Sequence, residues 1–221
     1  MEQITIVLAT TNQGKTEEIR DLLKDSPIII KNLTDFGPIP PVMENGSTFD
    51  ENAYIKSSFT ARVLGIPAIA DDSGLVVEAL DGKPGVHSAR YAGENATDEE
   101  KCQKLLKEMK GKENRNAAFE CVISIAVPGG PALTYEGKCK GTITKEPAGS
   151  NGFGYDPIFY YEAFDKTFAQ LTKEEKNEVS HRGKALKEIK NESDKIIEWI
   201  KMTRPELAKF KAENPTSCPG Q

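Results

Sequence analysis

The sequence predicts an α/β fold of the mixed (α+β) kind, with one mixed sheet, flanking helices and two lobes. Two observations carry this prediction. In the first half of the chain, β-branched runs such as residues 3–9 alternate with helical patterns, as in α/β proteins. In the middle, residues 118–127 alternate apolar and polar side chains, which is typical of a half-buried antiparallel strand. A length of 221 residues fits a single domain with two lobes and a substantial core.

The composition is ordinary for a soluble protein and argues against several classes of function. A net charge of -5 and a pI of about 5.3 argue against a general binder of nucleic acid or membrane surfaces, so a phosphate ligand would need a local cluster of positive charge. No apolar run is long enough to span a bilayer, and the first residues lack the basic and apolar regions of a signal peptide. We therefore expect no nucleic-acid partner and no membrane association.

Cysteine and histidine usage points to a reducing compartment. The 4 cysteines are widely spaced, with no Cys-x-x-Cys pair, and the chain has 2 histidines. This pattern argues against a zinc site or a disulfide framework and favours a cytoplasmic location.

The opening strand and its loop predict an anion site. Gln3 to Ala9 is a buried strand, Thr10 to Thr16 a loop, and Glu17 to Lys24 a helical pattern. Free N–H groups and the helix dipole at such a junction favour phosphate. The loop nearly matches a P-loop, with Gly14-Lys15-Thr16 in place, but Ala9 stands where the first glycine belongs. An ordinary strand-to-helix turn is the alternative.

A second strand, Pro27 to Lys31, precedes a loop rich in Pro and Gly, Phe36 to Gly46, which is too stiff and irregular for a helix. Glu44 is the only acid between Asp35 and Asp50. Taken alone it is an ordinary exposed loop glutamate.

The helix predicted over Phe49 to Leu64 carries polar residues on its apolar face. Thr48 and Glu51 match a capping box at its start. At about 100° per residue, Asn52 and Lys56 share a face with the apolar side chains. Because an unpaired buried ammonium is costly, Lys56 either snorkels to solvent or meets an anion, and we favour a buried site.

Two adjacent acids follow a short apolar run. Residues 67–70 lead into Asp71 and Asp72, and Ser73-Gly74 reads as a turn before the stretch Leu75 to Ala79. A strand that ends in acids at a turn can hold a divalent cation, because the turn exposes hard oxygen ligands. The alternative is an Asx-type turn in which the side chain bonds its own backbone.

The rest of the chain predicts a helix, a meander and a helical C-terminal part. A capping box at Thr97 and Glu100 opens a helix that ends near Lys110. After residues 118–127, Pro128 to Pro131 turns the chain into Ala132 to Lys140 and then Gly141 to Glu146. A third capping box, Thr172 to Glu175, precedes one last long helix that starts at Ser180 to Gly183 and has an apolar stripe of Leu186, Ile189, Ile196, Ile197 and Ile200. We expect a single domain over 1–204 and a polar tail over 205–221.

Residues 148–159 form a Gly-rich segment with aromatic side chains. Its glycines let the backbone approach a ligand closely, and Phe153 and Tyr155 could stack on a planar group. A loop with its aromatics packed in the core is the alternative.

Together these segments supply groups suited to phosphate, a metal ion and a flat base, which describes a nucleoside triphosphate. The groups suited to phosphate are Asn12, Lys15, Asn52, Lys56 and Arg90. Those suited to a metal are Asp71, Asp72 and Glu44.

The segments, in this order, resemble the inosine/xanthosine triphosphate pyrophosphatase family, which removes non-standard purine nucleotides. The resemblance covers about Ile4 to Ile200. The matching stretches are Thr10 to Lys15, Thr48 to Ala53 with Lys56, Ala70 to Gly74, Pro84-Gly85 with Ser88 to Tyr91, Gly152 to Pro157 and Ser180 to Gly183. Thr11 stands where many relatives place glycine, and the chain after Arg204 has no counterpart.

The resemblance implies an elongated sheet with substrate in the cleft between two lobes, and usually a homodimer. It implies Mg²⁺-dependent cleavage of ITP, dITP and XTP to the monophosphate and pyrophosphate. Asp72 would be metal ligand and proton acceptor, Glu44 would help to hold the metal, and Lys56 would assist. Because neighbours on an extended chain point to opposite sides, Asp71 would instead orient the turn or the water on the metal.

The resemblance also assigns substrate contacts. The triphosphate would be bound by Thr10, Thr11, Asn12, Gln13, Gly14 and Lys15, and Ser73 would touch substrate. The base would be cradled by Phe153, Gly154, Tyr155 and Asp156, and the oxygen at purine C6 would be read by Lys176, His181 and Arg182. A carbonyl accepts hydrogen bonds from such donors, whereas the amino group of adenine would leave them unpaired.

Two other readings stay open. The first is a P-loop NTPase that releases the γ-phosphate, against which Ala9 and the lack of further strand–helix repetition after the meander both argue. The second is a nucleotide sensor that binds without turnover.

Overall fold

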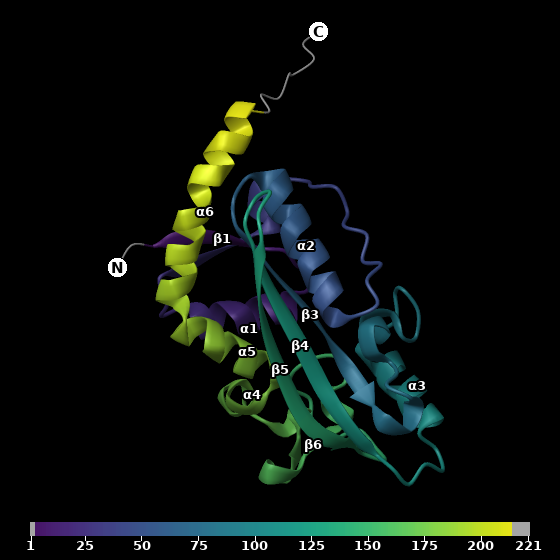
Figure 1. Ribbon diagram of the computed structural model, residues 1–221. Coiled ribbons are helices and arrows are strands. Elements are labelled where there is room, and N and C mark those ends of the chain that lie inside the picture. Colours follow the sequence, from purple (N-terminus) through teal and green to yellow (C-terminus); the bar gives the residue numbers. More distant parts are fainter. Residues whose placement is uncertain (1–2, 214–221) are drawn as a thin grey trace.

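The structure is a computed structural model that describes residues 3–213, with side chains described up to residue 203. One seven-stranded sheet runs through it in the order β2-β1-β3-β4-β5-β6-β7 (Figure 1). β1 (Ile4–Leu8) pairs in parallel with β2 (Ile28–Asn32) and β3 (Ala68–Val77). β4 (Asn116–Ala126) and β5 (Ala132–Ile143) continue the sheet in antiparallel fashion. The predicted mixed sheet is confirmed.

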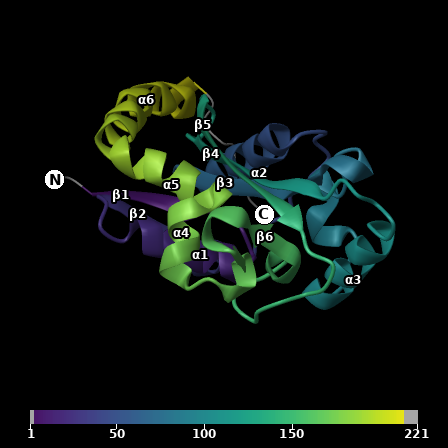
Figure 2. The same ribbon diagram turned by 90° about the horizontal axis from the view of Figure 1, so that it is seen from below.

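The sheet ends in two short antiparallel strands, β6 (Phe159–Tyr161) and β7 (Lys166–Thr167). Helix α2 (Phe49–Leu64) lies on one face of β3 and β4, and α1 (Gln13–Leu23), α4 (Lys173–Val179) and α5 (His181–Asn191) lie on the other (Figure 2). Among the described residues, none of the helices has the length and apolar character that crossing a bilayer requires.

Two of the three hydrophobic clusters of the described residues form the cores of the two lobes. One joins Ile123 and Ile125 of β4 to the β1, α1 and α5 end of the molecule. The other joins Phe119 of β4 to Leu105 of α3 (Asp98–Glu108) and Phe168. Figure 1 places these regions toward opposite ends of the long strands. The continuous backbones of β3, β4 and β5 connect the lobes.

β3 is one continuous strand of ten residues, so the predicted turn at Ser73-Gly74 is wrong. Asp72 pairs with Val122 and Ser73 with Cys121, and the ladder with β4 runs unbroken to Val77. Glycine at position 74 lets the segment that contains Gly85 and Ser88 approach β3 closely, because a Cβ would collide with the Gly85 carbonyl and the Ser88 hydroxyl. Glycine within a strand often marks such a contact, and sequence alone does not distinguish it from a turn.

Helix starts follow their caps, with two corrections. α1 begins at Gln13, four residues before the predicted start, because the Asn12 side chain accepts a hydrogen bond from the Lys15 N–H at 3.0 Å. Thr48 caps α2, but the Glu51 carboxylate accepts from Ser47 rather than closing the predicted capping box. The capping boxes at the starts of α3 and α4 are confirmed.

The C-terminal part contains two helices where one long helix was predicted. α5 ends at Asn191 and α6 covers Ser193–Glu213, separated by Glu192 at φ -101° and ψ 9°. The apolar stripe is therefore shared between the helices, and its residues lie in one cluster. The predicted domain boundary at residue 204 falls inside α6, and residues 214–221 of the predicted tail lie outside the described residues. β5 likewise continues through the break predicted at Gly141.

Candidate active site

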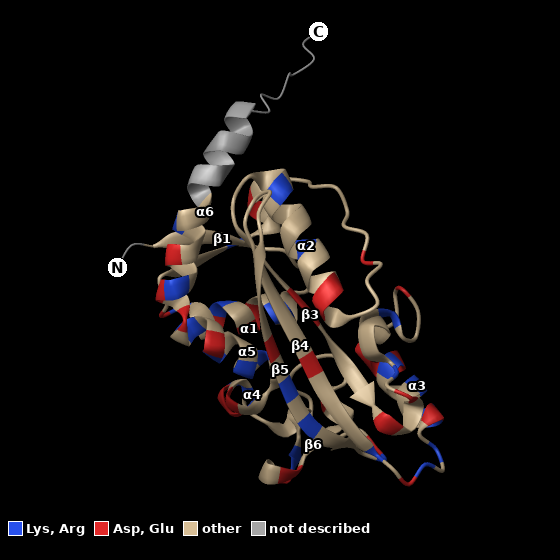
Figure 3. Ribbon diagram, in the orientation of Figure 1, with Lys and Arg blue, Asp and Glu red and all other residues tan. Residues whose placement is uncertain are grey.

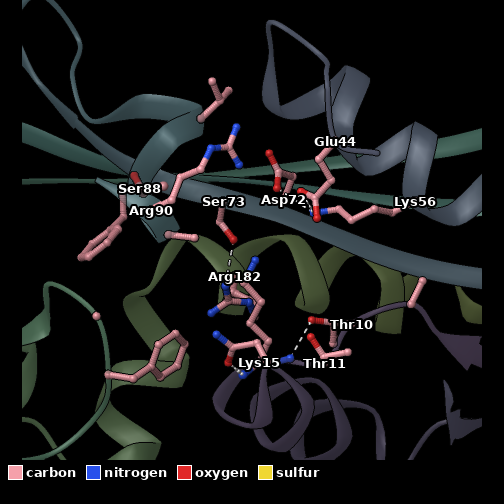
Figure 4. A pocket seen from close by; sticks show the side chains of 18 of the residues that line it. Thr10, Thr11, Lys15, Glu44, Lys56, Asp72, Ser73, Ser88, Arg90 and Arg182 are labelled. Atoms are coloured by element: carbon pink, nitrogen blue, oxygen red, sulfur yellow. Dashed lines mark hydrogen bonds and ion pairs between the residues drawn. The ribbon is translucent and has the colours of Figure 1, made fainter. Parts of the chain in front are cut away.

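A cavity of about 650 Å³ opens along the free edge of β3. β1 pairs with β3 only at Ala68 and Ile69, and within the described chain the rest of this edge of β3 carries no further strand, apart from the isolated bridge between Val76 and Pro84. The loop after β1, the loop before α2 and the loop of residues 152–156 close around the gap. Segments from both lobes therefore meet at the middle of β3 (Figure 4).

Asp72, Lys56 and Glu44 form one ion cluster on this wall. The Lys56 Nζ lies 2.7 Å from Asp72 Oδ1 and 3.0 Å from Glu44 Oε2. The Asn52 amide adds a contact of 3.4 Å to Asp72 Oδ2. Lys56 is buried, as the position of its residue on the α2 face led us to expect, and it meets anions rather than solvent. Burial opposes its charge, but the two carboxylates outweigh burial and raise the pKa of Lys56, so it is an ammonium ion.

Asp71 leaves the other face of β3 and enters a different ion cluster. Its carboxylate accepts from Arg182 Nε at 3.0 Å, from the Ser73 hydroxyl at 2.7 Å and from the Cys121 thiol at 2.9 Å, and it pairs with Lys15. Burial raises the pKa of Asp71, but Arg182 and Lys15 outweigh this and hold it well below its usual value. Asp71 therefore acts as a permanent anion within the protein.

Arg182 and Lys176 are both held by acids from other elements. Arg182, 2% exposed, pairs with Asp71 and with Glu18 of α1, and its Nη2 donates to Ser73 Oγ at 2.8 Å. Lys176 Nζ lies 2.6 Å from Asp156 Oδ2 and 2.9 Å from Glu18 Oε1. Both residues also line the cavity. Because an ammonium has three N–H groups and a guanidinium five, Lys176 and Arg182 each retain one N–H that a ligand can use.

His181 is buried beside them, and its ring stacks on Phe119 with centroids 4.8 Å apart. Its Nδ1 has no hydrogen-bond partner among the described residues. Burial and the nearby Arg182 charge hold the pKa of His181 well below its usual value, so the ring is neutral.

The Gly-rich loop divides its two aromatic residues between the cavity and the core. The Phe153 ring lies on Gly14, where a Cβ would come within 2.6 Å of it, and Lys176 Nζ is 4.7 Å from the ring centroid. Tyr155 is 3% exposed, and its hydroxyl donates to the Ser88 carbonyl at 2.9 Å. Phe153 therefore forms the flat wall, whereas Tyr155 mainly packs in the core.

The loop after β1 and the first turn of α1 contribute four of their six expected residues to the cavity lining, namely Thr10, Thr11, Asn12 and Lys15. Gln13 instead bonds Glu17 within α1 at 3.3 Å, and Gly14 supports Phe153. All the other expected residues line the cavity, namely Glu44, Lys56, Asp72, Ser73, Phe153, Gly154, Tyr155, Asp156, Lys176, His181 and Arg182.

The comparisons with known proteins identify the chain. The family model described as Ham1 family matches residues 6–192. This chain belongs to the Ham1 family. It is 59% identical over 216 residues to a protein of Desulfotalea psychrophila called dITP/XTP pyrophosphatase, covering 95% of this chain and 97% of that one. A protein of the same name from Syntrophobacter fumaroxidans is 56% identical, over 90% of this chain and 86% of the relative.

Solved Ham1 structures have the same fold. The HAM1 protein from Coxiella burnetii matches with a TM-score of 0.80 and 45% identity, over 86% of this chain and 98% of that chain. The Staphylococcus aureus Ham1 protein matches with a TM-score of 0.77 and 44% identity, over 85% and 96%. The family predicted from the motifs is therefore confirmed.

Arg90 is a further cationic residue that lines the cavity of this Ham1 chain. It faces the cavity from the segment Gly85–Arg90, and its Nη2 lies 3.3 Å from His87 Nδ1 (Figure 4). Among the described residues, it forms no ion pair with a carboxylate, unlike Lys15, Lys56, Lys101, Lys176 and Arg182. Its charge is therefore available to an anionic ligand. No role for Glu18 was predicted from the sequence. Nothing in the sequence near an acid on a helix indicates that it pairs with a buried arginine far along the chain.

The described part of this Ham1 chain contains no group of three or more His, Cys, Asp and Glu side chains placed to hold a metal. The two acids on Lys56 nevertheless suit a hard cation, because Asp72 and Glu44 turn carboxylate oxygens toward one positive charge. Mg²⁺ commonly binds one or two carboxylates together with substrate phosphates and water. The donor set therefore fits a Mg²⁺ that is completed by a phosphorylated substrate.

Proposed function

We propose that this protein hydrolyses non-canonical purine nucleoside triphosphates, namely dITP, ITP and XTP, to the nucleoside monophosphate and pyrophosphate. Eight relatives that are 45–59% identical are all called dITP/XTP pyrophosphatase, so the chain is a nucleoside triphosphate pyrophosphatase. The observation that carries the proposal is the pairing of Asp72 with Lys56 in a cavity bounded by the start of α1 and by Phe153.

The part of the cavity that would bind the triphosphate contains local cations, of which Lys15 is paired with Asp71. Lys15, the N-terminus of α1 and the carboxylate-free Arg90 lie along it, although charges of both signs alternate over much of the molecule (Figure 3). These groups would bind and orient the triphosphate against β3. Positioning and charge stabilisation are the main contributions that proteins make to phosphoryl transfer.

Asp72 would accept the proton of the attacking water. Burial, which exceeds the opposing effect of Lys56, raises the pKa of Asp72 and makes it a better base. Lys56 would hold the carboxylate in place and offer its remaining N–H to phosphate oxygen. Asp72 and Glu44 would hold Mg²⁺, which when bound supplies charge that stabilises the phosphate oxygens.

The base end of the cavity would select the purine. Phe153 would stack on the ring system, and the spare donors of Lys176 and Arg182 would meet a carbonyl at C6. An adenine presents an amino group there, which would leave buried donors without acceptors. We also propose that the protein forms a homodimer and that it is located in the cytoplasm.

Analysis of the products tests this function. Incubation with ITP and Mg²⁺ is expected to give IMP and pyrophosphate, with much slower turnover of ATP and GTP. Orthophosphate with IDP would instead indicate release of the γ-phosphate. Micromolar binding of ITP without any product would indicate a sensor.

A further inference from the structure

Both backbone polar groups of Gly154 are bonded to the first turns of α3. The Gly154 N–H donates to Asp98 Oδ2 at 2.6 Å, and the Cys102 thiol donates to the Gly154 carbonyl at 3.4 Å. Gly154 has φ +66°, in the left-handed region, and open space where a Cβ would stand. A helix more than 50 residues away in the chain thus holds the loop at its glycine.

Asp98 is itself held for this contact. Lys101 Nζ lies 2.7 Å from its other oxygen, Oδ1, and both residues line the cavity. Partial burial raises the pKa of Asp98, but the hydrogen bonds from Lys101 and from the Gly154 N–H outweigh it and lower the pKa. The acceptor is therefore a carboxylate, and hydrogen bonds to charged acceptors are the stronger kind.

Gly154 directly follows Phe153, whose ring forms the flat wall of the cavity. On the other side, the Phe153 N–H donates to Asp156 Oδ2 at 3.0 Å. The loop is thus held from two sides, by Asp156 within it and by α3 outside it. Loss of the Asp98 contact would leave the Gly154 N–H without its acceptor and only the weaker Cys102 thiol contact between Gly154 and α3, with a freer Phe153 ring.

We propose that Asp98 is a positioning residue that holds Gly154, and through it the Phe153 ring, at the base end of the cavity. Asp98 thereby determines how tightly the enzyme binds the planar part of its ligand, and not how it binds phosphate. The identity of that ligand rests on the proposed function, whereas the attachment of the loop does not.

Hydrogen exchange of the Gly154 amide tests the attachment without any turnover. In the full-length protein, Asp98→Ala is expected to lower the protection of this amide by about tenfold or more, because its charged acceptor is lost. Asp98→Asn retains an oxygen acceptor and is expected to keep most of the protection. The control is Glu99→Ala, which removes a neighbouring first-turn charge that, among the described residues, accepts one side-chain hydrogen bond, from Gln103 at 3.0 Å.

Steady-state kinetics test whether Asp98 affects binding of the planar part of the ligand. Asp98→Ala is expected to raise KM for ITP by about tenfold with a smaller change in kcat, as for a lost charge-assisted hydrogen bond. Inhibition by inorganic tripolyphosphate, which has no base, is expected to stay within about twofold of wild type. Asp98→Asn is expected to restore most of the KM.

Each outcome decides the matter. Unchanged protection of Gly154 in Asp98→Ala would overturn the attachment. An equal rise in KM in Glu99→Ala would assign the effect to the helix dipole, and an equal loss of tripolyphosphate inhibition would assign it to general damage to the cavity. If the wild type does not hydrolyse ITP, the proposed function fails, but the exchange measurement still confirms or refutes the role of Asp98.

Discussion

The carboxylates of Asp71 and Asp72 leave β3 on opposite faces, although the residues are adjacent in the chain. Asp71 meets Arg182 Nε at 3.0 Å, whereas Asp72 meets Lys56 Nζ at 2.7 Å. Alternation along a strand separates the two acids by geometry. One belongs to a buried cluster that joins α1, β3 and α5, and the other borders the cavity next to Glu44. The two positions should therefore respond differently to the same substitution.

Asp72→Asn is expected to abolish most turnover while the fold remains. The amide cannot accept a proton at this position, and loss of a general base typically lowers kcat by about 10²- to 10⁴-fold. Steady-state assays of pyrophosphate release with ITP, beside circular dichroism spectra of both proteins, check this. A variant as active as wild type would remove Asp72 from the reaction.

Asp71→Asn is expected to act on stability. It leaves Arg182, 2% exposed, with one acid fewer, and breaking a buried ion pair from one side costs about 3–5 kcal/mol. Urea titration is expected to show a loss in the free energy of unfolding near the lower end of that range, since Glu18 remains. Asp72→Asn is the matched control, and its loss should be smaller because Lys56 keeps Glu44. Equal losses would contradict the separation of the two clusters.

Lys56→Met is expected to weaken binding of the triphosphate without unfolding α2. Met packs on the same apolar stripe, but the substrate phosphates lose the Lys56 ammonium that lies between Asp72 and Glu44. KM for ITP should rise by about tenfold or more, the scale of a charge-assisted hydrogen bond. Lys107→Met, at an exposed position of α3, is the control and should leave KM unchanged.

Arg90→Ala is expected to raise KM for ITP by about tenfold, since it removes a cation from the phosphate end of the cavity. The melting temperature should barely change, because the described structure gives Arg90 no carboxylate partner to lose. Arg62→Ala removes an arginine whose guanidinium lies 5.9 Å from the Phe59 ring centroid and which does not line the cavity. If both variants bind ITP as the wild type does, Arg90 does not contact the phosphates.

Stability is expected to fall in mild acid because of His181. Burial and Arg182 hold its folded-state pKa well below the ordinary value of about 6.5, so below that pH the unfolded chain binds the extra proton. The free energy of unfolding should therefore decrease as pH falls from about 6.5 toward the folded-state pKa, by up to ~1.4 kcal/mol per pH unit.

Urea titrations at pH ~7, ~6 and ~5 measure this slope. His181→Phe removes the titrating group and keeps a ring against Phe119. The free energy of unfolding of this variant should therefore depend less steeply on pH, by an amount that corresponds to at most one bound proton. His87→Gln, at the other histidine of the chain, which is exposed, is the control for a histidine substitution outside the buried cluster. An unchanged slope in His181→Phe would mean that other groups cause the acid sensitivity.

The local features of this chain were predictable from its sequence. Helix α2 was predicted with the bounds it has, and two of three capping boxes form, because caps and helical periodicity depend on residues within one or two turns. The family followed from several short motifs in a fixed order. The burial of Lys56 beside an anion was also predictable, because a buried ammonium on an apolar helix face is energetically unfavourable unless an anion pairs with it.

Only the tertiary structure decided what each charged residue meets. Arg182 pairs with Glu18 across 164 positions of sequence, and that contact depends on how α1 and α5 pack on one face of the sheet. The continuity of β3 through Gly74 likewise depends on the approach of Gly85 and Ser88. Asp71 and Asp72 are two similar acids in the printed sequence. The open edge of β3 and the elements on its two faces make one a buried anchor and place the other in the cavity.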